Sequence, residues 1–394
     1  MKQVNLLTDS PRRLFFHYLG PTIGSSMVTS IYILADTIMV GQGVGDAGLA
    51  ALTIFMPIVA SFFALGLLLG IGGGVLMSVA KGSGNESLAH KYFSTAMISA
   101  AVVSVCFAVF GAIFFDPMMY ALGADTTNIE LVRGYGLCYT VSAPLFIFSS
   151  SLQSFIRNDK SPRHAMIAVL TGSGLNILLD YLFIFVFKMG MFGASFATSI
   201  GTSITVCILV IHFFTKKNTM RFSFRFFSIK ALWEIAKCGF SSFLIECANA
   251  VLVFVFNHTL LKYIGSVGVT VYSIMSNVAV VCMSLFNGVT LAAQPIIATN
   301  HGADNHKRVL QVRHIGTITS SVIAVIIFCV GFFFPDLLIY SYVKGPTPEI
   351  LELARYALRI YFFAYLFMNF NIFFSGYFQS TLRPVAAITI QILR

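Results

Sequence analysis

The sequence predicts an all-α polytopic membrane protein, and two features of its composition predict this class. Of its 394 residues, 57% are hydrophobic and only 10% are charged, whereas soluble domains carry about 25% charged residues. The apolar residues also fall into blocks of about 20 or more, the length that a helix needs to cross a hydrocarbon core of roughly 30 Å. Lipid is therefore the expected solvent for most of the surface.

Apolar blocks between charged or Gly/Pro-rich breaks predict ten membrane spans and the start of an eleventh. The first block is full length and contains Asp36, so we expect a retained span and not a cleaved signal segment. The eleventh begins after Pro384 and stops with the sequence at Arg394. The ten spans are expected near residues 14–39, 49–80, 92–115, 134–155, 164–187, 191–215, 231–260, 268–299, 315–335 and 350–378.

The loops on one side of the predicted spans contain many more Lys and Arg residues than the loops on the other side. Because cytoplasmic loops collect Lys and Arg, the richer side, with the amino terminus and the 216–230 loop, is expected to face the cytoplasm. Lys237, Arg355 and Arg359 lie just inside spans, and assigning each to its nearer end preserves the bias. The richer side holds Lys2, Arg12, Arg13, Lys81, Lys91, Arg157, Lys160, Arg163, Lys216, Lys217, Arg221, Arg225, Lys230, Lys307, Arg308, Arg313 and Arg383, and the poorer side holds Arg133, Lys188, Lys262 and Lys344.

The sequence lacks the patterns that are typical of nucleic-acid-binding proteins, metalloproteins and enzymes. The net charge of +10 is explained by membrane orientation, so no nucleic-acid partner is expected. The cysteines lack CxxC spacing and the histidines lack HExxH spacing, so no structural or catalytic metal is expected. No catalytic cluster such as a DDxxD motif appears, so we expect neither an enzyme nor a cofactor.

The chain contains an internal repeat. A shift of 220 residues places Gly45 on Gly265, and a shift of 222 places Pro162 on Pro384; other positions pair in the same way, namely Gly48 with Gly268, Gly82 with Gly302, Asn85 with Asn305, Leu131 with Leu353 and Arg133 with Arg355. Six spans in the first unit make the two units parallel repeats. We expect an amino-terminal lobe at 1–215, a cytoplasmic linker at 216–230 and a carboxyl-terminal lobe at 231–394. Adding 222 to residue 215 puts the end of the second unit near residue 437, so its last one to two helices are expected to be missing.

Three acidic residues, Asp36, Asp180 and Glu246, lie inside predicted spans. A charged side chain at that depth costs at least about 2.5–3.5 kcal/mol, so it needs a partner or a task. Asn176 precedes Asp180 by four residues, which places both on one helix face. Carboxylate and amide oxygens suit Na⁺, and a carboxyl group in a low dielectric can hold a proton instead. Asp36 and Asp180 therefore form a candidate cation site.

A simpler interpretation is that these acids lie near span ends or pair with hydroxyl groups such as those of Tyr139 and Ser142.

The second predicted span contains a cluster of glycines, which could indicate either a nucleotide-binding loop or close packing between helices. It follows no strand, so close helix packing is expected and a nucleotide loop is not. These glycines are Gly66, Gly70, Gly72, Gly73 and Gly74.

Several segments resemble bacterial exporters of the multidrug and toxic compound extrusion (MATE) family. They are LADTIMVGQGVGDAGLAALTIFMPI, GIGGGVLMSVAKGSGNESLAHKYF, RNDKSPRHAMIAVLTGSGLNILLDYLFIFVFKMGMFGASFATSI and AAQPIIATNHGADN, and they cover both halves of the chain. The resemblance implies twelve helices in two six-helix lobes, with export of amphipathic or cationic compounds by antiport with Na⁺ or H⁺. It also implies a monomer with drug-like substrates in a bacterial inner membrane.

The same resemblance assigns roles to particular residues. It implies that Asp36, Asn176 and Asp180 form the coupling-cation site of the amino-terminal lobe. A seventh-helix acid serves another branch of the family, with Glu246 as the matching candidate. That branch also uses a tenth-helix acid, but here the corresponding stretch offers only Asn369 and Asn371. A second coupling or substrate site at Glu246, Asn249 and Asn369 is thus the weaker expectation.

Two other functions remain open for a chain of this kind. A flippase or exporter of a lipid-linked or polysaccharide precursor would carry basic residues in its cavity to meet phosphates, and the predicted spans hold almost none. A passive channel would need neither the repeat nor the buried acids. The sequence leaves the substrate and the choice between Na⁺ and H⁺ undetermined.

Overall fold

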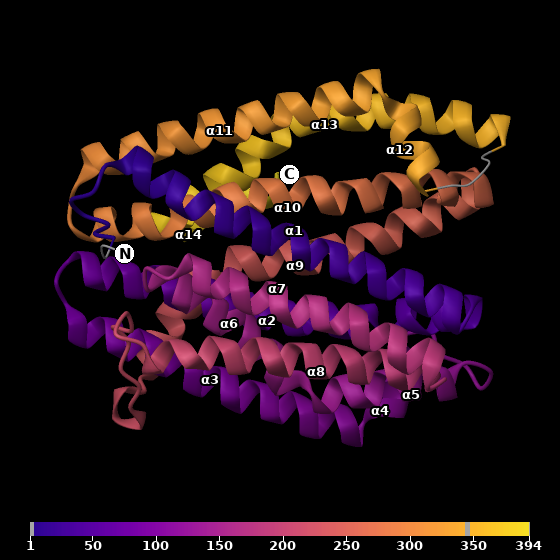
Figure 1. Ribbon diagram of the computed structural model, residues 1–394, viewed down its shortest axis with the longest axis horizontal. Coiled ribbons are helices and arrows are strands. Elements are labelled where there is room, and N and C mark those ends of the chain that lie inside the picture. Colours follow the sequence, from indigo (N-terminus) through magenta and orange to yellow (C-terminus); the bar gives the residue numbers. More distant parts are fainter. Residues whose placement is uncertain (1–3, 343–346, 394) are drawn as a thin grey trace.

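The computed structural model describes residues 4–342 and 347–393, apart from the side chains at positions 250, 253, 254, 257, 258, 261, 266 and 269. Lys2 and Lys344, which entered the charge comparison, lie outside the described residues. All regular elements in these ranges are helices, as the sequence predicted. The long helices run side by side along one axis (Figure 1).

The first half of the chain forms eight helices and two short distorted turns. They are α1 (Pro11–Gly43), α2 (Asp46–Gly82), α3 (Glu86–Ile113), α4 (Phe115–Ala121), α5 (Ile129–Val141), α6 (Ala143–Asn158), α7 (Pro162–Asp180), the π-helical η1 (Tyr181–Val186), α8 (Gly190–Ile211) and the 3₁₀ turn η2 (His212–Phe214).

The second half repeats this order as far as the chain extends. It comprises η3 (Phe224–Phe226), α9 (Ile229–Tyr263), α10 (Ser266–Gly302), α11 (His306–Phe333), α12 (Pro335–Tyr342), α13 (Pro348–Ser380) and α14 (Pro384–Ile392).

The chain is a multi-pass membrane protein. Among the described residues, eight helices are long and apolar enough to cross a membrane, and the α5–α6 pair adds a ninth span if its two parts are counted together. The two helices of that pair meet at 52°. The continuous span expected at 134–155 was therefore wrong in detail, because the chain breaks at Ser142 and restarts with Pro144, which lacks a backbone N–H, in the first turn of α6.

Two short helices were missed by the sequence analysis, and a salt bridge joins each of them to the helix that follows. Arg133 on α5 contacts Asp116 on α4 at 2.6 Å, and Arg355 on α13 contacts Asp336 on α12 at 2.5 Å. Asp116 and Asp336 are 220 residues apart, like the other repeated positions. The two halves thus carry the same contact at the same end of the bundle.

The turns between helices repeat as closely. Gly45 and Gly265 both adopt a positive φ, of 89° and 76°. Asn85 and Asn305 each cap the next helix, because their side chains accept a hydrogen bond from the backbone N–H three residues later. The repeat read from the sequence is therefore a repeat of backbone geometry.

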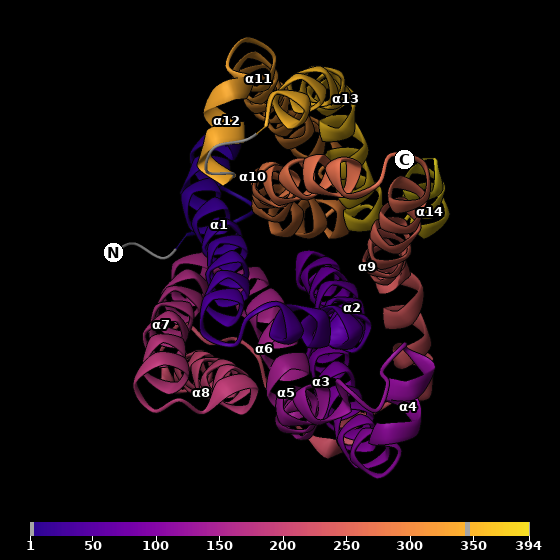
Figure 2. The ribbon, with the colours of Figure 1, turned by 90° about the vertical axis from the view of Figure 1, so that its right-hand side faces the viewer.

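Helix α1 packs between α7 of its own half and α10 of the other half, and α9 packs along α2 (Figure 2). The two halves also approach closely where α2 and α10 cross. A Cβ atom at Gly82 would collide with the carbonyl oxygen of Thr299, and one at Gly302 would collide with that of Val79. Only glycine allows this backbone contact.

The glycines inside α2 pack helices closely, as the sequence analysis expected. A Cβ atom at Gly70 would lie 2.7 Å from the Cα atom of Ser151 on α6. On the opposite side, a Cβ atom at Gly72 would collide with the backbone carbonyl of Ile235 on α9. This part of α2 is therefore held between the two halves of the molecule.

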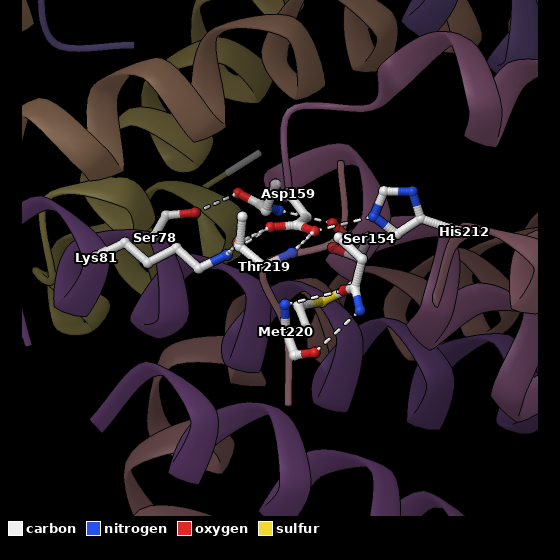
Figure 3. Close-up of polar contacts among 9 residues, drawn as sticks. Ser78, Lys81, Ser154, Asp159, His212, Thr219 and Met220 are labelled. Carbon is white, nitrogen blue, oxygen red and sulfur yellow. Dashed lines mark hydrogen bonds and ion pairs between the residues drawn. The ribbon is translucent and has the colours of Figure 1, made fainter. Parts of the chain in front are cut away.

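A buried aspartate organises one end of the bundle, at the turn between α6 and α7 (Figure 3). Asp159 is 1% exposed, and its carboxylate accepts hydrogen bonds from Lys81 at 2.5 Å and His212 at 2.9 Å. The backbone N–H of Thr219 donates to the same group at 3.0 Å, and the Thr219 hydroxyl also contacts it. Asp159 thereby connects α2, the turn η2 and the chain that follows η2.

Candidate cation-binding site

The structure places Asp36, Asn176 and Asp180 near one another where α1 packs against α7. Asp36 is 8% exposed, Asn176 3% and Asp180 0%. Asp36 lies on α1, whereas Asn176 and Asp180 lie one turn apart on α7, as their spacing predicted. The carboxyl groups of Asp36 and Asp180 lie close enough to interact electrostatically.

Local features of both helices place these groups face to face. The π-helical turn η1 begins directly after Asp180, and the backbone N–H of Phe187 donates to the carbonyl of Leu182, five residues earlier, at 2.8 Å. Such turns are frequent at functional sites. Gly43, two turns beyond Asp36, leaves room for η1, because a Cβ atom there would collide with Ile184. The end of α1 therefore lies against α7 and η1.

Helices α7 and α8 approach through glycine in the same region. A Cβ atom at Gly201 on α8 would lie 2.8 Å from the carbonyl oxygen of Gly172 and 2.9 Å from the Cβ atom of Asn176. This close approach brings Thr198 to the site, where its hydroxyl accepts a hydrogen bond from Asn176 Nδ2 at 3.2 Å. Small residues at helix interfaces allow such contacts inside membranes.

Four oxygen atoms of the site have no hydrogen-bond partner among the described residues. They belong to the three predicted site residues: Asp36 Oδ1, Asn176 Oδ1, Asp180 Oδ1 and Asp180 Oδ2. Buried polar atoms are nearly always paired, so such a concentration calls for an explanation. Two ionised carboxylates this close repel each other, and a proton or a cation between them removes the repulsion. Oxygen atoms of this type are the ligands that hard cations prefer.

Sequence reasoning missed two residues of this site, Thr198 and Tyr32. Thr198 lies on α8, and nothing in its local sequence connects it to Asn176. Tyr32 lies one turn before Asp36 on α1, close enough to both carboxyl groups to interact with them electrostatically. Its i, i+4 spacing to Asp36 is a signal that was available in the sequence. The alternative partner Tyr139 is buried, and its ring stacks on Phe146 with centroids 4.2 Å apart.

A small cavity of about 60 Å³ adjoins the site. Tyr32, Asn176 and Thr198 line it together with other side chains of α1, α2, α6, α7 and α8, among them Thr29, Phe63, Ser149, Gln153, Ser173 and Thr205. The lining contains no charged side chain. A cavity of this size holds water or a small cation, whereas drug-sized ligands need several hundred Å³.

The second candidate group is not assembled in the same way. Glu246 is partly buried on α9, and Asn249, one turn later, is exposed. Asn369 on α13 is 1% exposed, and its amide group is fully engaged. It donates to the backbone carbonyls of Tyr365 and Leu366 and accepts from the Ser320 hydroxyl at 3.2 Å. Asn369 therefore offers no unpaired amide oxygen comparable to Asn176 Oδ1.

Comparisons with known proteins agree with this architecture. The MatE family model matches residues 21–182 and 238–394. A curated relative, the multidrug export protein MepA of Staphylococcus haemolyticus, is 25% identical over 371 residues, which cover 94% of this chain and 81% of that protein. MepA of Staphylococcus saprophyticus is 26% identical over 382 residues, or 96% and 83% of the two chains.

Two solved structures extend the likeness to the fold. A MATE family transporter of the MOP superfamily, in an outward-facing conformation, superposes with a TM-score of 0.93 at 22% identity, over 100% of this chain and 88% of the other. A MOP superfamily transporter from Pyrococcus furiosus, described by the reverse polarity of its binding pocket, superposes at 0.91 and 22% identity, over 100% and 87%.

Proposed function

The chain belongs to the MatE family, and on this premise we propose that it is a secondary active multidrug exporter, which exchanges amphipathic or cationic organic compounds for Na⁺ or H⁺. The observation that carries this proposal is the buried pair of carboxyl groups of Asp36 and Asp180, whose oxygens lack partners. The multidrug export proteins among the curated relatives support the substrate class. We further propose a monomer in a bacterial inner membrane with a cytoplasmic amino terminus.

In this proposal, Asp36 and Asp180 bind the coupling cation. Asn176 Nδ2 donates to Thr198, which orients the amide so that Oδ1 remains for the cation. Since Asp36 belongs to α1 and the other two to α7, a bound Na⁺ or proton stabilises the contact between these helices. An empty site leaves two carboxylates facing each other and favours their separation.

Helix α1 links the cation site to the rest of the molecule. It contacts α7 at the site and α10 of the other half along its length. A movement of α1 relative to α7 therefore changes the interface between the halves, where the drug is proposed to bind. Exchange then requires only that the cation and the drug differ in their affinity for the two arrangements. The 60 Å³ cavity serves water or the cation and is too small for the drug.

The test is export of a fluorescent organic cation from proteoliposomes under an imposed Na⁺ or pH gradient. We expect one of the two gradients to drive export, and we expect Asp36→Asn and Asp180→Asn to lower the gradient-driven rate at least about tenfold, because each removes a charge that the cation neutralises. Asp46→Asn, an exposed acid at the start of α2, is the matched control and should export normally.

Two results would contradict the proposal in different ways. Full gradient dependence in Asp36→Asn would exclude this site as the place of coupling. Absence of gradient-driven export in the wild type would favour a flippase of lipid-linked or polysaccharide precursors, which the same vesicles would reveal with a fluorescent lipid-linked substrate. The membrane spans hold almost no basic residues that could meet a phosphate, which argues against that alternative.

A further inference from the structure

The segment between α8 and α9, residues 214–230, exposes large apolar side chains at one end of the bundle. Phe214 is 86% exposed, Phe224 76% and Ile229 73%, and Phe222 and Phe227 are also exposed. Phe214 ends η2, Ile229 begins α9, and the other three lie between them. We refer to residues 214–230 as the linker segment.

The linker segment is also strongly basic. Its exposed charged side chains are Lys216, Lys217, Arg221, Arg225 and Lys230, and its sequence contains no Asp or Glu. Basic and aromatic residues alternate along it, as in Arg221, Phe222, Phe224 and Arg225. Basic residues beside exposed aromatic ones are typical of segments that lie at the surface of anionic membranes.

Hydrogen bonds hold the linker segment in a defined position. Thr219 is bound to the buried Asp159 (Figure 3). The N–H of Ser223 donates to the Ser94 hydroxyl at 3.1 Å, and the N–H of Ser228 donates to the Thr95 hydroxyl at 3.3 Å. Ser94 and Thr95 belong to α3, so the backbone is fixed to the bundle while the Phe and Arg side chains point away from it.

The segment lies at the level of the lipid headgroups, because it connects the ends of two long helices, α8 and α9, and passes beside α3. Figure 1 shows it at the end of the bundle that also carries the amino terminus. This is the end that the distribution of Lys and Arg assigns to the cytoplasm, where anionic lipids give the membrane a negative surface potential. Exposed phenylalanine is unfavourable in water but favourable at the acyl boundary below the headgroups.

We propose that the linker segment is a binding surface for anionic phospholipids. Arg221, Arg225 and Lys216 contact the phosphate groups, and Phe222, Phe224 and Phe227 enter the acyl boundary beneath them. Arginine suits this role, because its planar guanidinium group binds phosphate oxygens through two parallel hydrogen bonds. The inference does not depend on which compounds the protein exports.

The only tryptophan of the chain provides a probe. Trp233 is 62% exposed and lies one turn beyond the linker segment on α9. Energy transfer from Trp233 to a dansyl-labelled lipid reports how often that lipid occupies the surface. The full chain is reconstituted in phosphatidylcholine vesicles with equal small amounts of dansyl-phosphatidylglycerol or dansyl-phosphatidylcholine. We expect stronger transfer to the phosphatidylglycerol probe and a decrease of this preference with added salt.

The charge variant is Lys216→Gln/Arg221→Gln/Arg225→Gln. Each basic side chain near an anionic surface changes lipid affinity by about fivefold, so the three together should lower the phosphatidylglycerol preference by up to about a hundredfold. The matched control, Arg12→Gln/Arg13→Gln/Lys307→Gln, removes the same charge from exposed positions at the same end of the bundle and should retain most of the preference. Size-exclusion profiles check that both variants fold.

Two outcomes would overturn the proposal. Equal transfer to both lipid probes in the wild type would show that the surface does not select anionic lipid. Equal losses in the charge variant and in the control would show that only the total charge at this end of the bundle attracts the lipid, without a binding surface on the linker segment.

Discussion

The two halves of the chain share a framework but differ in the chemistry placed on it. Counted back from the paired turns at Gly45 and Gly265, the position of Asp36 on α1 corresponds to Phe256 on α9. The amino half thus has a buried carboxyl group where the carboxyl half has an exposed aromatic ring. The repeated turns and helices maintain the fold, whereas the acidic residue that is not repeated belongs to the proposed cation site.

The same contrast appears at the turn that follows α6 and α13. Asp159, with its hydrogen bonds to Lys81, His212 and Thr219, corresponds to Thr381 at an offset of 222. The Thr381 hydroxyl donates only to backbone carbonyls of its own helix. Among the described residues, Thr381 thus lacks the ion pairs that Asp159 forms with Lys81 and His212.

The largest effect is expected where the frame is most symmetric, at the crossing of α2 and α10. Gly82→Ala and Gly302→Ala should each cost about 3 kcal/mol, because a new Cβ atom would collide with a backbone carbonyl that cannot move alone. Thermal unfolding in detergent measures the loss. If the crossing is one shared contact, the double variant should lose less than the sum of the two single losses. If the two single variants lose different amounts of stability, the two glycine contacts do not contribute equally.

A smaller loss of stability is expected from a substitution at Asp159, and its counterpart in the second half, Thr381, should not show the same loss. Burial raises the pKa of Asp159, but the hydrogen bond from His212 and the charge of Lys81 outweigh it, so its pKa lies below the ordinary value of about 4. The stabilisation is therefore complete above about pH 4 and is lost as the pH falls through the lowered pKa. Asp159→Asn should cost about 2 kcal/mol at pH 7, and the difference from wild type should shrink below pH 4.

The counterpart Thr381→Val is the control for this comparison. It removes only hydrogen bonds within α13, so its cost should stay below about 1 kcal/mol and should not depend on pH. Thermal unfolding from pH 3 to 8 measures both variants. A constant difference between Asp159→Asn and wild type across that range would mean that the charge of Asp159 does not contribute.

The smallest effect tests whether both halves tolerate the same backbone strain. Lys160 and Leu382 occupy equivalent turns, with φ values of 61° and 54°, a region that favours glycine. Lys160→Gly and Leu382→Gly should each stabilise the protein by up to about 1 kcal/mol, measured by thermal unfolding. Leu382→Ala keeps the strained conformation and should bring no gain.

Much of the fold could be predicted from the sequence because hydrophobic length and turn residues are local signals. The helix expected at 49–80 is observed at Asp46–Gly82, and the paired glycines mark equivalent turns. The break at Ser142 and the π-helical turn after Asp180 were missed, because both interrupt a continuous apolar run. The short helices α4 and α12 were missed because they are shorter than a membrane span.

The candidate site could be predicted only in part. Asp36 and Asp180 stand out because acids are rare inside spans, and Asn176 follows from its spacing to Asp180. Thr198 could not be found, because its place beside Asn176 depends on the close approach of α7 and α8 at Gly172 and Gly201. Asn369 resembles a site residue in sequence, yet its amide is engaged in hydrogen bonds within its own half.

The glycine crossing has a further consequence for the origin of the chain. Gly82 meets Thr299 while Gly302 meets Val79, and each of these two contacts becomes the other when residues are shifted by 220. Such reciprocity is the property of an interface between identical subunits related by a two-fold axis. Two separate copies of one half-length chain would form the same crossing, so a homodimeric ancestor would already have had this contact before duplication and fusion joined its subunits.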